Sequence, residues 1–274
     1  MNHYIKLVNF EVKRFSKLFL ALIIAVVAAQ IFGAIITSLH YVSNAETTML
    51  RDQMTVSDYI QNYGAYSLQN FLFSEYFILS VVFAAALLMI YDFFIWYRDW
   101  LGKSSVIYRL LMLPTARRNV YFAKLTTILL FVFGLTGMQI ILLEVVKQIT
   151  QQIVPDQLWQ ADSVIYIYST DILNLLYPQS PLLFVFYYVI GITAVAVIFT
   201  SILFERSYHL KGIFLALIYS VISVVIVMVP VIIQTITDYF YRNEIYLIVT
   251  GFSILTTALA IYLADYLLKR KINV

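Results

Sequence analysis

Long apolar runs alternate with shorter polar segments along the chain. Six of these runs can cross the hydrocarbon core of a bilayer, which is about 30 Å thick and requires about 20 helical residues. They are Leu18–Leu39, Phe71–Trp96, Val120–Val146, Pro181–Phe204, Gly212–Ile233 and Ile245–Leu268. The pattern therefore predicts an all-α membrane protein, with six transmembrane helices in one domain over residues 18–274.

The first 17 residues have a different pattern. Ile5, Val8, Val12 and Phe15 recur at helical spacing, while Lys and Asn residues occupy the other side. An amphipathic helix of this kind lies in the plane of a membrane surface. We therefore expect an interfacial elbow helix over residues 1–17. The alternative is that its basic residues serve only as an orientation signal.

Composition agrees with a membrane-embedded chain. Of the 274 residues, 62% are hydrophobic and only 12% are charged, whereas about 25% of residues in a soluble domain are charged. A net charge of +3 does not indicate nucleic-acid binding. The absence of cysteine excludes disulfides, thiol catalysis and cysteine-ligated metals.

The positions of the basic residues predict the orientation. Of the 18 Lys and Arg residues, 15 lie at the N-terminus, in 98–124, in 205–211 or at the C-terminus. Since cytoplasmic loops carry the excess of Lys and Arg, both termini are expected in the cytoplasm. The pattern fits a multi-pass protein of the bacterial plasma membrane.

Two long loops, 45–70 and 147–180, then lie on the outer side. The stretch DSVIYIYSTDILNLLYPQSP, residues 162–181, is too polar to span the membrane and too apolar for a free loop. It is either an interfacial lid over an exit path or a passive cap that packs on the helix bundle.

A proline interrupts the cytoplasmic loop 98–120, within the sequence RLLMLPTARRNVYFAKL. A short helix is expected before Pro114, because proline lacks an N–H and clashes with the preceding turn. This helix has too many apolar residues for a free loop, so it needs a surface that buries them. A partner protein is one candidate, and a lipid-facing interfacial turn is the other. The apolar residues are Ile107, Leu110, Leu111, Met112 and Leu113.

The stretch SSVIYRLLMLPTARRNVYFAKL resembles the first cytoplasmic loop of ABC-2-type transporter permeases. The shared pattern is a short apolar helix, Leu-Pro, a hydroxyl residue, arginines, and a lysine where the next span begins. VNFEVKRFSK resembles the N-terminal elbow helix of that family, and LLKRKINV resembles its basic C-terminus. Many members carry a re-entrant helical element before the last span, for which 234–244 is too short.

The resemblance implies the permease subunit of an ATP-driven exporter, working as a dimer with a second copy or a related chain. A separate ATPase subunit would bind ATP and Mg²⁺, since this chain has no G-x-x-x-x-G-K-[ST] motif and is expected to hold no cofactor itself. The short helix would be the coupling helix that docks on the ATPase. The residues expected in this contact are Tyr108, Arg109, Leu110, Leu111, Leu113, Pro114, Arg117 and Arg118.

Polar residues near the outer side of the spans are few. Glu75 and Glu144 either line an outer vestibule or simply reach water. Pro230 should kink the fifth span and is a candidate hinge. His40 and His209 are isolated at span ends, and neither is expected to bind a ligand.

At the inner side, Asp92, Arg98 and Asp99 form either a local ion pair or a group with a role in coupling. Asp265 and Lys269 are spaced to pair on a helix. Aromatic residues in the same region are expected to form an inner interfacial belt. They are Tyr91, Trp96, Tyr97 and Trp100.

Catalytic motifs such as H-E-x-x-H and G-x-S-x-G do not occur, so no enzymatic activity is expected. Mostly apolar and aromatic spans suit an amphiphilic substrate that is moved outward: a hydrophobic or antimicrobial peptide, a lipid-like molecule or a drug. The alternative is a non-transporting six-span membrane sensor or assembly partner.

Overall fold

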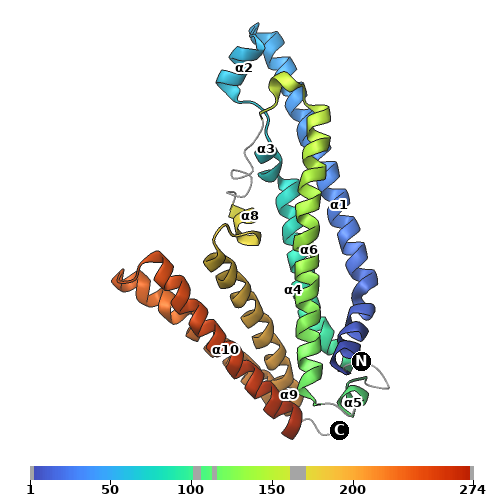
Figure 1. The fold of residues 1–274 in the computed structure, drawn as a ribbon, viewed down its shortest axis with the longest axis vertical. Coiled ribbons are helices and arrows are strands. Elements are labelled where there is room, and N and C mark those ends of the chain that lie inside the picture. Colours follow the sequence, from blue (N-terminus) through green and yellow to red (C-terminus); the bar gives the residue numbers. More distant parts are fainter. Residues whose placement is uncertain (1–2, 101–105, 113–115, 161–170, 272–274) are drawn as a thin grey trace. The chain divides into compact units, whose positions relative to one another are not determined.

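The computed structural model describes residues 3–100, 106–112, 116–160 and 171–271. Helices form most of these ranges, which contain no strand beyond a single parallel bridge between Tyr66 and Trp159. The elements in chain order (Figure 1) are α1 (His3–Asp52), α2 (Val56–Tyr63), α3 (Leu68–Leu72), α4 (Glu75–Trp100), α5 (Val106–Leu111), α6 (Arg118–Ile153), the 3₁₀ turn η1 (Asp156–Leu158), α8 (Asp171–Leu176), α9 (Pro181–Thr237) and α10 (Arg242–Arg270).

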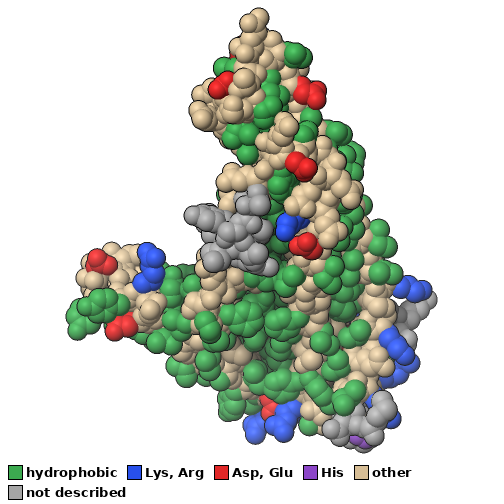
Figure 2. Space-filling view, turned by 45° about the horizontal axis from the view of Figure 1, so that its top comes forward, with side chains coloured by type: hydrophobic (Ala, Val, Ile, Leu, Met, Phe, Trp, Pro, Cys, Tyr) green, Lys and Arg blue, Asp and Glu red, His purple; other side chains and the backbone are tan. Residues whose placement is uncertain are grey.

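Five of the described helices are long and apolar enough to cross a membrane: α1, α4, α6, α9 and α10. They contain the predicted apolar windows, except that residues 71–74 of the second window precede α4, with Phe71 and Leu72 in the separate helix α3. Many of their large apolar side chains are exposed, and Figure 2 shows broad hydrophobic tracts over the helices. Lipid is the solvent that suits such surfaces. The fold is therefore that of a multi-pass, all-helical membrane protein.

Helix α9 covers two predicted spans because it folds back on itself at His209. The backbone there is non-helical, with φ 54° and ψ −129°. Ser201 and Ser220 would lie about 28 Å apart on a straight helix, yet their hydroxyl oxygens are 2.8 Å apart. Gly212 makes the close return possible: a Cβ there would lie 2.3 Å from the carbonyl oxygen of Phe204. Helix α9 thus consists of two arms.

The first arm of α9 packs along α10 through small and hydroxyl residues. Thr193 donates to the carbonyl of Ser253 at 3.1 Å, and Thr200 donates to that of Ala260 at 3.1 Å. The separation in sequence is 60 residues in both pairs, so the arm and α10 run in the same direction. Such small residues let two membrane helices approach closely, and the threonine hydroxyls of one helix then hydrogen-bond to backbone carbonyls of the other.

The described part of the expected elbow helix, residues 3–17, is continuous with the first span. Helix α1 is continuous from His3 to Asp52, 50 residues in all. Its first part packs on the protein through Leu7, Glu11 and Phe15, whereas Ile5 is exposed. The buried face therefore contains a carboxylate and follows a different stripe from the apolar one that the sequence suggested.

The chain divides into two compact units, each described separately. Unit 1 comprises Met1–Phe15, Leu88–Phe131 and Gln179–Val274, and unit 2 comprises Ser16–Leu87 and Val132–Pro178. Unit 1 contains the ends of α1 and α10 nearest the chain termini. Within it, Tyr4 of α1 bonds Thr126 of α6 at 2.5 Å, and Arg117 donates to the carbonyl of Leu268 in α10 at 2.6 Å. The start of α1 and the end of α10 therefore both lie near the first turns of α6 in unit 1.

The expected long loops 45–70 and 147–180 contain much helix in their described parts, 45–70, 147–160 and 171–180. Helix α1 extends to Asp52 and α6 to Ile153, because their ends pack with α2 and η1 in a small cluster. This cluster buries Ala45, Tyr59, Tyr66, Val154 and Leu158. The extensions satisfy their backbone hydrogen bonds internally and bury aromatic surface that an open loop would leave in water.

The candidate lid lies partly outside the described residues, since 161–170 are not described. In its described part, Leu173 of α8 is fully buried in the main core of unit 2. The hydroxyl of Tyr177 donates to the carbonyl of Thr136 in α6. These contacts favour the interpretation of a packing cap for residues 173–177.

Candidate functional site

Helix α5 sits between two long apolar helices of unit 1 and has two distinct sides. Ile107, Leu110 and Leu111 are buried, with at most 8% of their surface exposed. Tyr108 and Met112 are exposed at 40% and 68%, and Arg109 is exposed as well. The chain itself therefore covers these three side chains, which were expected to need either a partner's surface or lipid.

The other residues expected in the coupling contact have different surroundings. Arg117 is half-buried and caps the C-terminal end of α10 through the carbonyl of Leu268, where a cation also interacts favourably with the helix dipole. Arg118 is exposed at the start of α6. Leu113 and Pro114 lie outside the described residues. Among the described residues of 106–118, the large side chains that are exposed are those of Tyr108, Arg109, Met112 and Arg118.

Beneath this surface, five charged residues of α1, α4 and α6 form a buried ionic network in unit 1. Lys124 uses its three N–H groups on Glu11 at 2.8 Å, Asp99 at 2.5 Å and the carbonyl of Ile95 at 2.8 Å. The second oxygen of Glu11 accepts from Arg98 at 2.9 Å, and that of Asp99 accepts from Arg14 at 2.5 Å.

Every carboxylate oxygen and every ammonium hydrogen of this network has a partner, which buried charges require. Lys124, Asp99 and Glu11 are almost completely buried. The network joins α1, α4 and α6 at one end, so these helices form a connected group there. Three cations and two anions leave it with one net positive charge.

The network corrects two expectations for this region. Asp92, Arg98 and Asp99 do not pair among themselves: Arg98 and Asp99 bond residues of other helices, and one oxygen of the buried Asp92 has no partner among the described residues. The prediction of an inner interfacial belt is wrong for Tyr91 and Trp96, whose side chains are only 2% and 0% exposed. They pack inside unit 1 instead of at a lipid interface.

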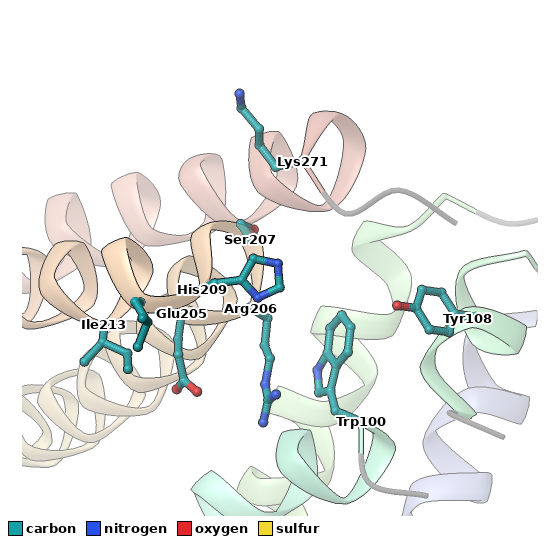
Figure 3. Close-up of a pocket in the computed structure, with 9 residues that line it drawn as sticks. Trp100, Tyr108, Glu205, Arg206, Ser207, His209, Ile213 and Lys271 are labelled. Atoms are coloured by element: carbon teal, nitrogen blue, oxygen red, sulfur yellow. The ribbon is translucent and has the colours of Figure 1, made fainter. Parts of the chain in front are cut away.

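A cavity with a volume of about 680 Å³ opens beside α5 (Figure 3). It is lined by the end of α4, by α5, by the reversal of α9 and by the end of α10. Its residues are Trp100, Tyr108, Glu205, Arg206, Ser207, His209, Leu210, Ile213 and Lys271. All of them belong to unit 1, and we call this cavity the α9-turn pocket.

Arg206 is the central cation of the α9-turn pocket. Its guanidinium lies over the ring of Tyr97, 4.8 Å from the centroid, and near that of Trp100 at 5.8 Å. The neighbouring Glu205 accepts a hydrogen bond from the Tyr97 hydroxyl instead of pairing with Arg206. In Figure 3 Arg206 extends between Glu205 and Trp100, while His209 lies near the start of the Arg206 side chain and Lys271 points away from the group.

His209 has the backbone conformation that the reversal needs, although it is not glycine. A positive φ of this kind costs about 1–3 kcal/mol and persists only where the surrounding structure imposes it. Strained residues occur preferentially at functional sites. The histidine that sequence reasoning set aside therefore lies at the pocket, brought there by a turn that no local motif announces.

The remaining candidate residues do not line this pocket. Glu75 opens α4 and Glu144 lies in α6, and both are exposed residues of unit 2. Pro230 is buried in the second arm of α9, where the backbone keeps helical φ and ψ. Within α9 the departure from helical geometry is at His209, so the break lies 21 residues before the expected hinge. Asp265 and Lys269 pair as predicted, at 2.6 Å.

In comparisons with known proteins, no family model, no curated protein and no solved structure matches the chain.

Proposed function

We propose that the chain is the membrane permease subunit of an ATP-driven ABC exporter of the ABC-2 type, with α5 as the helix that contacts a separate ATPase. The observation that carries this proposal is the two-sided burial of α5. Its inner side chains anchor it in unit 1, while Tyr108, Arg109 and Met112 remain exposed on its outer side. An exposed patch on a firmly held helix is what a docking contact requires.

The ionic network supports a coupling role for the same region. A short helix transmits a movement only if the long helices beside it move with it. Lys124, Glu11 and Asp99 connect α6 with α1 and α4 close to the two ends of the 100–118 segment. Displacement of α5 by a partner would therefore act on three long helices together.

Six crossings with both termini in the cytoplasm belong to the same proposal. Six helical arms follow if α9 crosses twice, and the reversal at His209 supports this. The 15 basic residues on one side support a cytoplasmic location for α5, the α9-turn pocket and the ionic network. The permease would act as a dimer in the plasma membrane and move an amphiphilic substrate outward.

Co-purification tests the proposal. The tagged chain would be expressed in its native host, and the proteins eluting with it in mild detergent would be identified. Wild type should retain an ATPase subunit, and the double variant Arg109→Glu, Met112→Asp should lose most of it. Leu110 and Leu111 are unsuitable positions, because their replacement would disrupt folding.

The matched control carries the same kinds of change at exposed residues of the turn before α10, namely Tyr239→Asp and Arg242→Glu. This variant should retain the ATPase. If wild type brings no ATPase, or if the α5 variant retains as much as the control, the exporter proposal fails. A non-transporting sensor or assembly partner would then be the better interpretation.

A further inference from the structure

We propose that the α9-turn pocket binds the phosphate group of an anionic membrane phospholipid. This inference goes beyond the exporter proposal and does not depend on an ATPase. Soluble phosphate offers the same chemistry, so the experiment below separates the two sources.

Unsatisfied hydrogen-bond donors are the first reason. The Nε of Arg206, the hydroxyl of Ser207 and the indole N–H of Trp100 are buried without a partner among the described residues. Arginine and indole nitrogens only donate, so neither can satisfy the other. Buried polar groups are almost always hydrogen-bonded. Arg206 and Trp100 lie side by side in Figure 3, and an acceptor with several oxygens, such as phosphate, would satisfy both of these donors.

The environment of Arg206 is the second reason. Arg14 and Arg98, also in unit 1, are each held by a carboxylate. Arg206 instead lies against aromatic rings, and the carboxylate beside it is bonded to Tyr97. A planar guanidinium held in this way keeps its N–H groups available for two oxygens of one phosphate.

Charge and shape favour a lipid over a free ion. The lining contains Arg206 and Lys271 beside Glu205, and Arg206 is the cation that faces the group, since Lys271 points away from it. The same pocket is lined by Leu210 and Ile213, which are 85% and 51% exposed and would suit an acyl chain. Basic pockets between membrane helices on the cytoplasmic side are typical sites for anionic headgroups. A volume of about 680 Å³ accommodates a headgroup with the start of its chains.

The test uses the full chain in neutral detergent. Binding of phosphatidylglycerol and of phosphatidylcholine would be titrated by native mass spectrometry, with thermal unfolding as a second readout. Wild type should bind phosphatidylglycerol in preference, and Arg206→Gln should weaken that binding about tenfold or more, as expected for loss of a charged hydrogen-bond donor. Ser207→Ala should weaken it less.

Arg270→Gln is the matched control. Arg270 also lies over an aromatic ring, that of Tyr266 at 5.4 Å, but it does not line the pocket. The Arg270→Gln variant should bind phosphatidylglycerol as wild type does. Equal losses in the Arg206 and Arg270 variants, or equal binding of the two lipids, would overturn the proposal in favour of general surface attraction.

A third titration uses inorganic phosphate alone. If phosphate binds and no lipid does, the pocket recognises a soluble anion and the lipid assignment is wrong. If lipid binds and millimolar phosphate does not displace it, the acyl chain contributes as proposed. Should Arg206→Gln fail to fold, Arg206→Lys gives the same discrimination, because it keeps the charge and loses the paired geometry.

Discussion

Lys124 and Glu11 are separated by 113 residues in sequence, and their side chains meet at 2.8 Å in a buried site of unit 1. Removal of one member of a buried ion pair leaves the other charge unsatisfied, which costs about 3–5 kcal/mol. Lys124→Gln should therefore greatly reduce stability in detergent, measured by thermal unfolding. Lys269→Gln removes an exposed pair with Asp265 and should cost about 0.5 kcal/mol or less. Similar losses in both variants would contradict the burial of the network.

The reversal of α9 predicts opposite effects for two glycines of one helix. A Cβ at Gly212 would lie 2.3 Å from backbone, whereas a Cβ at Gly191 has no described atom within 4 Å outside its own helix backbone. Gly212→Ala should lower the yield and melting temperature of the purified protein. Gly191→Ala should be neutral or stabilising by up to about 1 kcal/mol, as alanine favours helix. A harmless Gly212→Ala would argue against a tight turn.

The side-chain amides of Gln30 and Gln139 in unit 2 bond each other in both directions, at 3.0 and 2.8 Å. Such bonds between membrane helices contribute about 0.6 kcal/mol on average. Gln30→Leu and Gln139→Leu should each destabilise the protein, because Gln30→Leu removes the Gln139 amide's partner and Gln139→Leu leaves the Gln30 amide only its bond to Ser80 at 2.9 Å. The double variant should be less damaging than the sum. Strict additivity in detergent-unfolding titrations would show that the two amides are not coupled.

The N-terminal cap of α2 predicts that the local stability of this helix depends on pH. Hydrogen bonds from the side chain and the backbone N–H of Thr55 hold the pKa of the Asp58 carboxyl below its ordinary value. A depressed folded-state pKa gives stability that is present above the unfolded pKa of about 3.9 and is lost as pH falls through the folded value. Protection of α2 amides from hydrogen exchange should thus stay constant down to about pH 4 and be lost as the pH is lowered further. Asp58→Asn should remove this change, and an unaltered profile in that variant would contradict the assignment.

Membrane topology can be tested by labelling single introduced cysteines, because the chain has no cysteine of its own that would react. Leu210 and Tyr239 are exposed, at 85% and 80%, near the two ends of the second α9 arm. A membrane-impermeant maleimide should label Tyr239→Cys in intact cells. It should label Leu210→Cys and Met112→Cys only after the membrane is opened. Labelling of Leu210→Cys from outside would rule out two crossings by α9.

Several features were predictable because they depend on local pattern alone. The apolar windows occur in long helices, since a run of 20 apolar residues in lipid must satisfy its backbone internally. The 234–244 connection is short as expected, and Asp265 pairs with Lys269 because both lie on one helix face. The apolar residues of 107–111 also needed burial, although the surface that buries them was misidentified.

Other features depended on which helices meet, and sequence position does not specify that. In the sequence, each of Glu11, Asp99 and Lys124 is a single charged residue near the end of a span. Only the packing of α1, α4 and α6 brings them into one network. Arg206 and His209 likewise had no motif around them. A turn forced by close packing placed them beside Trp100 and Tyr108.

The sequence by itself determined that the chain is helical, membrane-embedded and basic at one set of helix ends, because hydropathy and charge act along the chain. Tertiary structure alone decided the two-sided burial of α5, the reversal within α9, the ionic network and the α9-turn pocket. Each of these arises from contacts between residues far apart in sequence, where the cost of an unpaired buried charge or a steric clash selects one arrangement.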